Sequence, residues 1–191
     1  MKEKVDFQMT IETVAIYPFT SDTGAIHSAV IHANEILFFP VRPIEIIDYN
    51  LRLIGSSLRG AKDSAKRILK SASMYPVVTD IVKRIVWFPT ESMKNDTCAW
   101  VSLNYYKRLF RIDDYITKIH LHGKYDLTVP VSENPIDNRV TSAHYLRSIL
   151  LQNANTHLFL YGQGRQEVML VSDGLRVEYE LKHNEQEGSL K

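Results

Sequence analysis

The chain has 191 residues, 45% of them hydrophobic and 24% charged, with a formal net charge of +1, a balance typical of a globular protein with a buried core. No apolar run approaches the ~20 residues that cross a bilayer, and the N-terminus lacks the apolar segment of a secretory signal peptide. A single cysteine excludes an internal disulfide, so we expect a protein of the reducing cytosol.

The first elements in chain order are strands. Apolar, β-branched and aromatic residues predict strands over residues 12–19, 25–32 and 36–41, with a turn at residues 20–24 and a tight connection at Asn34 and Glu35. Short connections of this kind predict an antiparallel meander. Pro43 then starts a segment, residues 44–49, whose apolar spacing predicts a helical turn.

A basic amphipathic helix is predicted next. Its apolar stripe consists of Leu58, Ala61, Ala65, Ile68, Leu69 and Ala72, which recur at helical spacing. Arg59, Lys62, Lys66 and Lys70 follow the same spacing one residue later, about 100° round the helix, and form a basic face. A hydroxyl of Ser56 or Ser57 is expected to cap the helix by accepting a free backbone N–H. The alternative is an ordinary solvated helix face.

This helix lies in a segment that carries most of the positive charge. Between Leu51 and Lys124, fourteen Lys or Arg stand against six Asp or Glu, a net charge of +8, while the remaining nine basic and sixteen acidic residues give −7. A basic segment between acidic flanks indicates a polyanionic partner. The alternative is that carboxylates of the flanks fold back and neutralise it.

The rest of the chain predicts more strands and one more helix. Apolar runs at residues 85–88 and 98–103, separated by a polar loop, predict two strands, with Trp87 and Trp100 in the core. Residues 115–121 and 125–131 predict a hairpin around Gly123 and Lys124. Pro135 is expected to open a helix, whose apolar face is made by Val140, Ala143, Leu146, Leu150 and Leu151. Short apolar runs follow at residues 158–161 and 168–171.

Together these elements predict an α+β fold. It should be rich in strands, with antiparallel sheets and a few short helices. We expect one compact domain over residues 1–181 and a polar C-terminal tail over residues 182–191.

The sequence contains no complete motif for catalysis or metal binding. His120 and His122 alternate on one strand, but a metal needs further ligands, and Cys98 is a single cysteine. Gly55-Ser56-Ser57 lacks the spacing of a nucleophile elbow. The sequence has no phosphate-binding loop and no dinucleotide fingerprint. We expect no catalytic residues, no metal, no cofactor and no enzyme activity.

Three motifs follow one another in the centre of the chain: Ile54-Gly55-Ser56-Ser57 with Gly60 and Lys62, then Phe88-Pro89-Thr90, then Cys98-Ala99-Trp100-Val101-Ser102. They carry most strongly a resemblance to the ComK family of bacterial competence transcription factors. It extends over roughly residues 36–171. Pro43 with Ile46, Ile47 and Asp48 lies in its first part, and Gly123-Lys124, Pro130-Val131-Ser132, Asn138, Leu146-Arg147, Arg165-Gln166-Glu167 and Met169-Leu170 follow.

The resemblance implies an activator of DNA-uptake genes that works in the cytoplasm, on the nucleoid. Such a protein recognises paired A·T-rich boxes in double-stranded DNA, largely through the minor groove, and assembles as a dimer, tetramer or higher oligomer. It acts by helping RNA polymerase. The residues expected to contact DNA are Arg59, Lys62, Lys66, Arg67 and Lys70, with Ser56, Ser57, Lys83 and Arg84 beside them.

The chain departs from the family pattern at three places. Gly60-Ala61-Lys62 stands where many members have Gly-Arg-Lys, and Met74-Tyr75-Pro76 where they have Lys-Pro-Pro. Some members use a Phe-Met-Leu-Tyr-Pro-Lys run to bind a MecA-like adaptor of a Clp protease. The matching positions here begin with Val168, Met169 and Leu170, and the run lacks both aromatics and the lysine.

These departures leave two alternatives to duplex binding. The first is a regulatory protein-interaction module of the same fold that has lost productive DNA binding. The second is a single-strand binder that stacks bases on Tyr105, Tyr106 and Trp100.

Overall fold

The structure, a computed structural model, describes residues 5–70, 74–160, 167–172 and 177–182, with side chains as far as residue 153. The chain divides into two compact units, Met1–Gln152 and Asn153–Lys191, and each is treated by itself.

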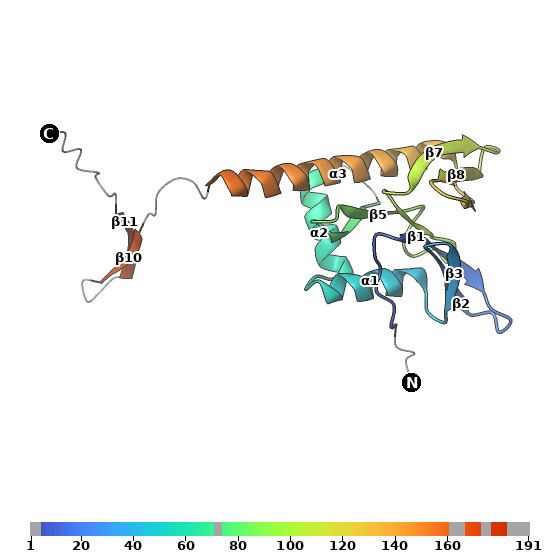
Figure 1. Cartoon of the computed structure of the whole chain (residues 1–191), viewed down its shortest axis with the longest axis horizontal. Helices are drawn as coiled ribbons and strands as arrows, with labels where there is room; N and C mark the ends of the chain where they lie inside the picture. The colour runs from blue at the N-terminus through green and yellow to red at the C-terminus, as the bar shows by residue number, and fades with distance from the viewer. Residues whose placement is uncertain (1–4, 71–73, 161–166, 173–176, 183–191) are drawn as a thin grey trace. The chain divides into compact units, whose positions relative to one another are not determined.

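A six-stranded antiparallel sheet is the centre of the first unit (Figure 1). The predicted meander is present as β1 (Thr13–Thr20), β2 (Ile26–His32) and β3 (Glu35–Phe39). The sheet continues on the other side of β1 through β6 (Trp100–Ser102), β5 (Ile85–Pro89) and β4 (Val77–Asp80), in the order β3-β2-β1-β6-β5-β4. β4 has only four residues and was not predicted.

One face of this sheet is covered by the helix α1 (Pro43–Leu53). Ile46, Ile47 and Leu51 are fully buried against Trp87 and Trp100, both of which are 0% exposed, as predicted for these tryptophans. α1 is longer than the single turn expected at residues 44–49, because its apolar spacing continues to Leu51 and a cap ends it only at Ile54.

The opposite face packs against a second, three-stranded sheet and the helix α3 (Glu133–Leu160). This sheet has the order β7 (Tyr106–Arg111), β8 (Thr117–Leu121) and β9 (Asp126–Val129), and the last two strands form the predicted hairpin. Side chains alternate between the two cores: Val86 and Phe88 of β5 face this one, whereas Trp87 faces α1.

α3 begins in the predicted region but extends beyond residue 151 to Leu160, so that it contains most of the apolar run at residues 158–161. In the second unit β10 (Glu167–Ser172) contains the run at residues 168–171 and pairs antiparallel with β11 (Val177–Lys182). Some predictions fall outside the described residues, namely those for Ala72, residue 161 and residues 183–191. The α+β class with antiparallel sheets is confirmed, and the domain limits at residues 181 and 182 stay a prediction.

We predict that Ile46→Ala lowers the free energy of unfolding by about 2–5 kcal/mol, because it leaves a cavity in the fully packed core beside Trp87 and Trp100. Leu53→Ala on the same helix is the control, since Leu53 is 51% exposed, and should cost less than about 1 kcal/mol. Urea unfolding followed by tryptophan fluorescence measures both, and equal losses would contradict this packing.

Candidate nucleic-acid interface

The interface begins at the four-residue connection between α1 and α2 (Leu58–Leu69). Gly55 has φ +76°, in the left-handed region that favours glycine. Its N–H donates to the carbonyl of Arg52 at 3.1 Å, and the Ser56 N–H donates to the carbonyl of Leu51 at 2.9 Å. These two bonds form a Schellman motif, which ends α1 and turns the chain sharply into α2.

The first turn of α2 is held by two side chains. The Ser57 hydroxyl accepts the N–H of Gly60 at 3.1 Å, so Ser57 is the cap and Ser56 lies in the turn before it. One carboxylate oxygen of Asp48, on α1, accepts the N–H of Leu58 at 2.8 Å, and the other oxygen lies 2.8 Å from Nε of Arg52. Asp48 therefore joins the end of α1, the connection and the start of α2.

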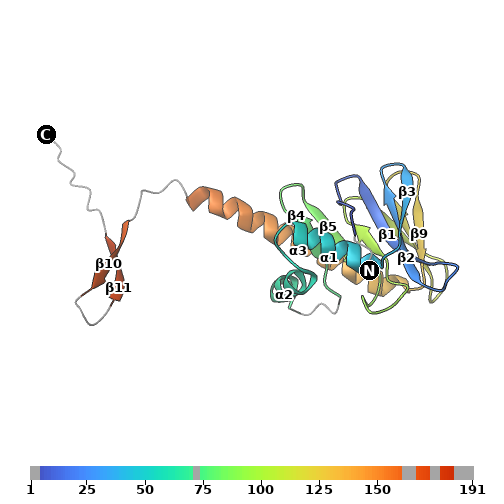
Figure 2. The same ribbon diagram turned by 90° about the horizontal axis from the view of Figure 1, so that it is seen from below.

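The apolar stripe of α2 packs as predicted over its first half, whereas Ile68 and Leu69 are only partly buried and belong to neither core. Ala65 is 1% exposed, and Leu58 and Ala61 pack against the core beneath α1. α2 contacts both α1 and β4, and Figure 2 shows it beside α1. The opposite, basic side of α2 is consequently turned to solvent.

We call Arg59, Lys62, Lys66, Arg67 and Lys70 the basic ridge. All are exposed except Lys62, which is partly buried. Arg59 has a side chain 93% exposed and lies 4.0 Å from Asp63, a geometry worth little in water. The other four have no carboxylate within 4.0 Å among the residues that the structure describes.

Lys83 and Arg84 lie in the turn between β4 and β5, at the edge of the large sheet. Lys83 lines a hollow together with Asn50, Leu53 and Ile54, so it lies on the same side as the α1–α2 connection. Arg84 lines a different hollow, beside α3. Neither side chain has an acidic partner within the described part of the chain.

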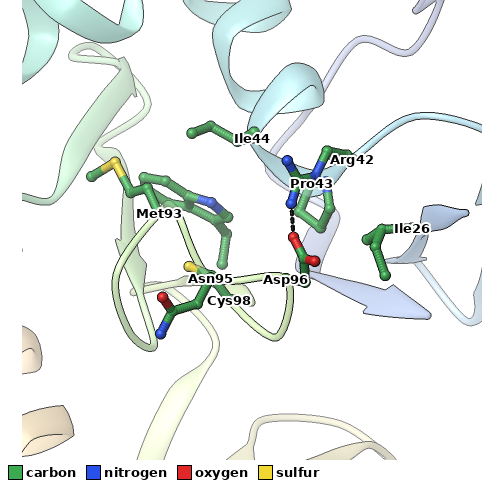
Figure 3. Close-up of a pocket in the computed structure, with 9 residues that line it drawn as sticks. Ile26, Arg42, Pro43, Ile44, Met93, Asn95, Asp96 and Cys98 are labelled. Atoms are coloured by element: carbon green, nitrogen blue, oxygen red, sulfur yellow. Dashed lines mark ion pairs between the residues drawn. The ribbon is translucent and has the colours of Figure 1, made fainter. Parts of the chain in front are cut away.

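Arg42, at the start of α1, is an example of a cation in this fold that has a carboxylate partner (Figure 3). Its guanidinium forms an ion pair with Asp96 of the loop between β5 and β6. The adjoining hollow, lined by Met93, Asn95 and Cys98 among others, is about 10 Å³, room for about one water molecule. Arg42 therefore has a carboxylate partner from another loop, although both side chains are exposed, whereas Lys62, Lys66, Arg67 and Lys70 have none in the described residues.

The flanking carboxylates do not neutralise the basic segment in the part of the chain that the structure describes. Asp48 pairs with Arg52, but no other acidic residue outside 51–124 lies within 4.0 Å of a Lys or Arg of that segment. Asp48 was not predicted to have this role, and its place in the motif with Pro43, Ile46 and Ile47 is the signal that the sequence offers.

The residues considered for other chemistry have ordinary roles. His120 lies 2.5 Å from Asp126 on the neighbouring strand, and His122 is exposed. Burial raises the pKa of the Cys98 thiol from 9.0 to about 11, which keeps it protonated and unreactive at neutral pH. Trp100 is fully buried and cannot stack on a base. Within the described residues no group of three or more His, Cys, Asp or Glu could hold a metal ion.

Among the helices in the described residues, none has the length and apolarity needed to span a bilayer.

Comparison with known proteins gives two matches. The model of the ComK protein family matches residues 4–155. The competence transcription factor of Bacillus subtilis (strain 168) is 26% identical over 153 residues, which are 78% of this chain and 79% of that protein. No solved structure matches the chain.

We predict that Asp48→Ala destabilises the protein by about 1.5–3 kcal/mol, because the backbone N–H of Leu58 loses a charged acceptor. Asp48→Asn keeps an oxygen acceptor and should lose less. Asp63→Ala, which removes only an exposed ion pair with Arg59, is the control and should cost at most about 1 kcal/mol. Denaturant unfolding measures all three, and a loss for Asp48→Ala no larger than for Asp63→Ala would contradict this role.

Proposed function

This chain belongs to the ComK family, and from that membership we propose that it is a DNA-binding transcription activator of competence genes. The family consists of transcription factors rather than enzymes, so the expectation that the chain is not an enzyme is confirmed. We propose double-stranded DNA as its partner and the basic ridge, with Ser56, Ser57, Lys83 and Arg84, as its binding surface.

The observation that carries the proposal is the lack of acidic partners for Lys62, Lys66, Arg67 and Lys70 in the described residues. Four like charges on one short helix repel one another, and like-charge neighbours at helical spacing destabilise a helix. A polyanion relieves this repulsion. On duplex DNA each cation that neutralises a phosphate also releases a condensed counterion, which favours binding at low salt.

We propose further that the protein recognises paired A·T-rich boxes, mainly through the minor groove. That groove distinguishes A·T from G·C pairs but little else, and its narrowing in A-tracts deepens the negative potential that attracts Lys and Arg. Two facing half-sites match a symmetric assembly, so binding as a dimer, tetramer or higher oligomer belongs to the same proposal.

The proposal includes the setting in which the protein acts. We place it in the cytoplasm on the nucleoid, where it helps RNA polymerase at promoters of DNA-uptake genes. Val168, Met169 and Leu170 lie in β10 and remain the candidate contact for a MecA-like adaptor of a Clp protease. The two aromatics and the lysine of the family run are absent here, which argues for weak adaptor binding.

A second candidate function is a regulatory interaction module without productive DNA binding. The observations that favour it are Ala61 and Met74, which stand where many family members carry basic residues. Such a module would bind a protein partner in a salt-insensitive manner and would show no affinity for a duplex.

We predict that Lys62→Glu with Lys66→Glu lowers affinity for a duplex carrying two facing A·T-rich boxes on the order of 100-fold or more, since two phosphate contacts become repulsive. The far-UV circular dichroism should stay unchanged, because Lys66 is exposed and Lys62 only partly buried. Fluorescence anisotropy of a labelled duplex measures the loss.

The control is Lys94→Glu with Lys107→Glu, two exposed lysines outside α2, which alters the net charge by the same amount. Full binding by the α2 variant, or an equal loss in this control, would refute the assignment of the basic ridge.

We also predict how the groove is read. Inosine lacks the exocyclic amino group of guanine, so an I·C pair presents an A·T-like minor groove and a G·C-like major groove. The protein should bind an I·C-substituted box nearly as tightly as the A·T box and several-fold more tightly than a G·C box. Binding to the I·C duplex as weak as to the G·C duplex would assign recognition to the major groove.

A further inference from the structure

The width of the minor groove limits which element of this protein can read it. An α-helix with its side chains is about 10–12 Å across, whereas the minor groove of B-DNA is about 6 Å wide. α2 therefore does not fit into an undistorted minor groove as a helix. Its basic ridge can lie along the phosphates that border the groove, and the bases must then be reached from a narrower element.

The turn between β4 and β5, residues 81–84, is such an element. β4 is the edge strand of the large sheet, so no further strand of that sheet lies outside the hairpin. The Ile81 carbonyl accepts the Arg84 N–H at 3.2 Å, and the Asp80 carboxylate accepts the Lys83 N–H at 2.8 Å. These bonds give the turn a defined shape before any ligand binds, which lowers the entropic cost of ordering it on DNA.

The composition of the turn is unusual for a solvent-exposed tip. Val82 is 91% exposed and Ile81 51% exposed, although both are aliphatic and β-branched. Lys83 and Arg84 follow directly and have no carboxylate partner in the described residues. Proteins that bind the minor groove insert side chains of these two kinds into it. Apolar side chains contact the base edges and the sugars, and cationic side chains are attracted by the negative potential of the groove.

The surroundings of the turn add one carboxylate and one further cation. Lys83 lines one hollow with Asp80, Leu53 and Ile54, next to the connection that leads into α2. On the other side Arg84 and Ile81 share a hollow with Arg147 of α3, and no acidic residue lines it. The turn thus has the α1–α2 connection on one side and a further cation on the other.

We propose that the β4–β5 turn, Ile81 to Arg84, is the element that enters the minor groove, while the basic ridge of α2 binds the phosphates beside it. This inference rests on the proposed function, and it assigns A·T selectivity and general affinity to different parts of the protein. The occupant is duplex DNA, because free cations surround the exposed aliphatic tip and a protein partner of that shape would need acidic groups around an apolar pocket.

The test compares two double variants of the full chain on A·T-rich and G·C-rich duplexes by fluorescence anisotropy over a salt series. Lys83→Ala with Arg84→Ala should lower the ratio of A·T to G·C affinity by about fivefold or more, as expected when a groove contact is lost. Lys66→Ala with Lys70→Ala should weaken binding to both duplexes alike and reduce the slope of log K against log salt by about 1.8.

Val82→Ser tests the apolar tip without changing charge. It should lower the A·T to G·C ratio and leave the salt slope as in the unaltered protein, and Ile36→Ser, at a 38% exposed position on the opposite edge strand β3, is its matched control. Thermal unfolding of each variant separates a binding effect from misfolding.

The outcomes distinguish this inference from the function on which it rests. An unchanged affinity ratio in both turn variants, or an equal fall of the ratio in the α2 variant, overturns the inference while duplex binding stands. An unaltered protein that binds neither duplex overturns the proposed function, and the inference with it.

Discussion

The large sheet must be covered on both faces, and this constraint decides where the basic residues lie. Its strands alternate apolar side chains to two separate cores, one beneath α1 and one beneath the small sheet and α3. α1 takes the face that holds Trp87 and Trp100, so α2 has only the side of α1 and the edge strand β4 left to pack against. A helix in that position buries a narrow stripe around Ala65 and presents the rest to solvent.

The connection between α1 and α2 determines that the basic residues of α2 lie on the protein surface. Gly55 and the Asp48 carboxylate fix the direction in which α2 leaves α1, and that direction turns the basic ridge outward. For Arg42 the fold supplies a partner carboxylate, that of Asp96 in another loop. It supplies none within ion-pair distance of Lys62, Lys66, Arg67 or Lys70 in the described residues. Repulsion on α2 is tolerable because α1 and β4 hold the helix in place.

The sequence predicted the strongly patterned elements and missed the weakly patterned ones. The meander, the β8–β9 hairpin and α2 with its Ser57 cap follow from alternation, helical spacing and cap chemistry, which are local properties. β4 has four residues, and β7 is an edge strand with four exposed side chains, so neither carries an alternating pattern that would reveal it. The length of α1 depends on the burial of its apolar residues beneath the sheet. Local sequence patterns do not predict this tertiary burial.

The sequence predicted which cations belong to the candidate site. It did not predict how these cations are arranged on the protein surface. Counting charge identified the segment that contains Lys62 and Lys66, yet only the tertiary structure shows which cations have partners. The contribution of Asp48 arises from its contact with Leu58, ten residues further along the chain in the next helix, and the exposure of Val82 depends on the hairpin lying at the sheet edge. The Asp48 contact and the exposure of Val82 both result from tertiary packing, which the amino-acid composition does not determine.

The most direct test of the account is the affinity of the unaltered protein for a labelled duplex with two facing A·T-rich boxes, against a G·C-rich duplex of equal length, over a salt series. We predict tighter binding to the A·T duplex, with log K falling linearly with log salt at a slope of about −0.9 per phosphate contact. Absence of binding to either duplex at low salt would contradict it and would favour an interaction module that retains the fold without the DNA-binding function.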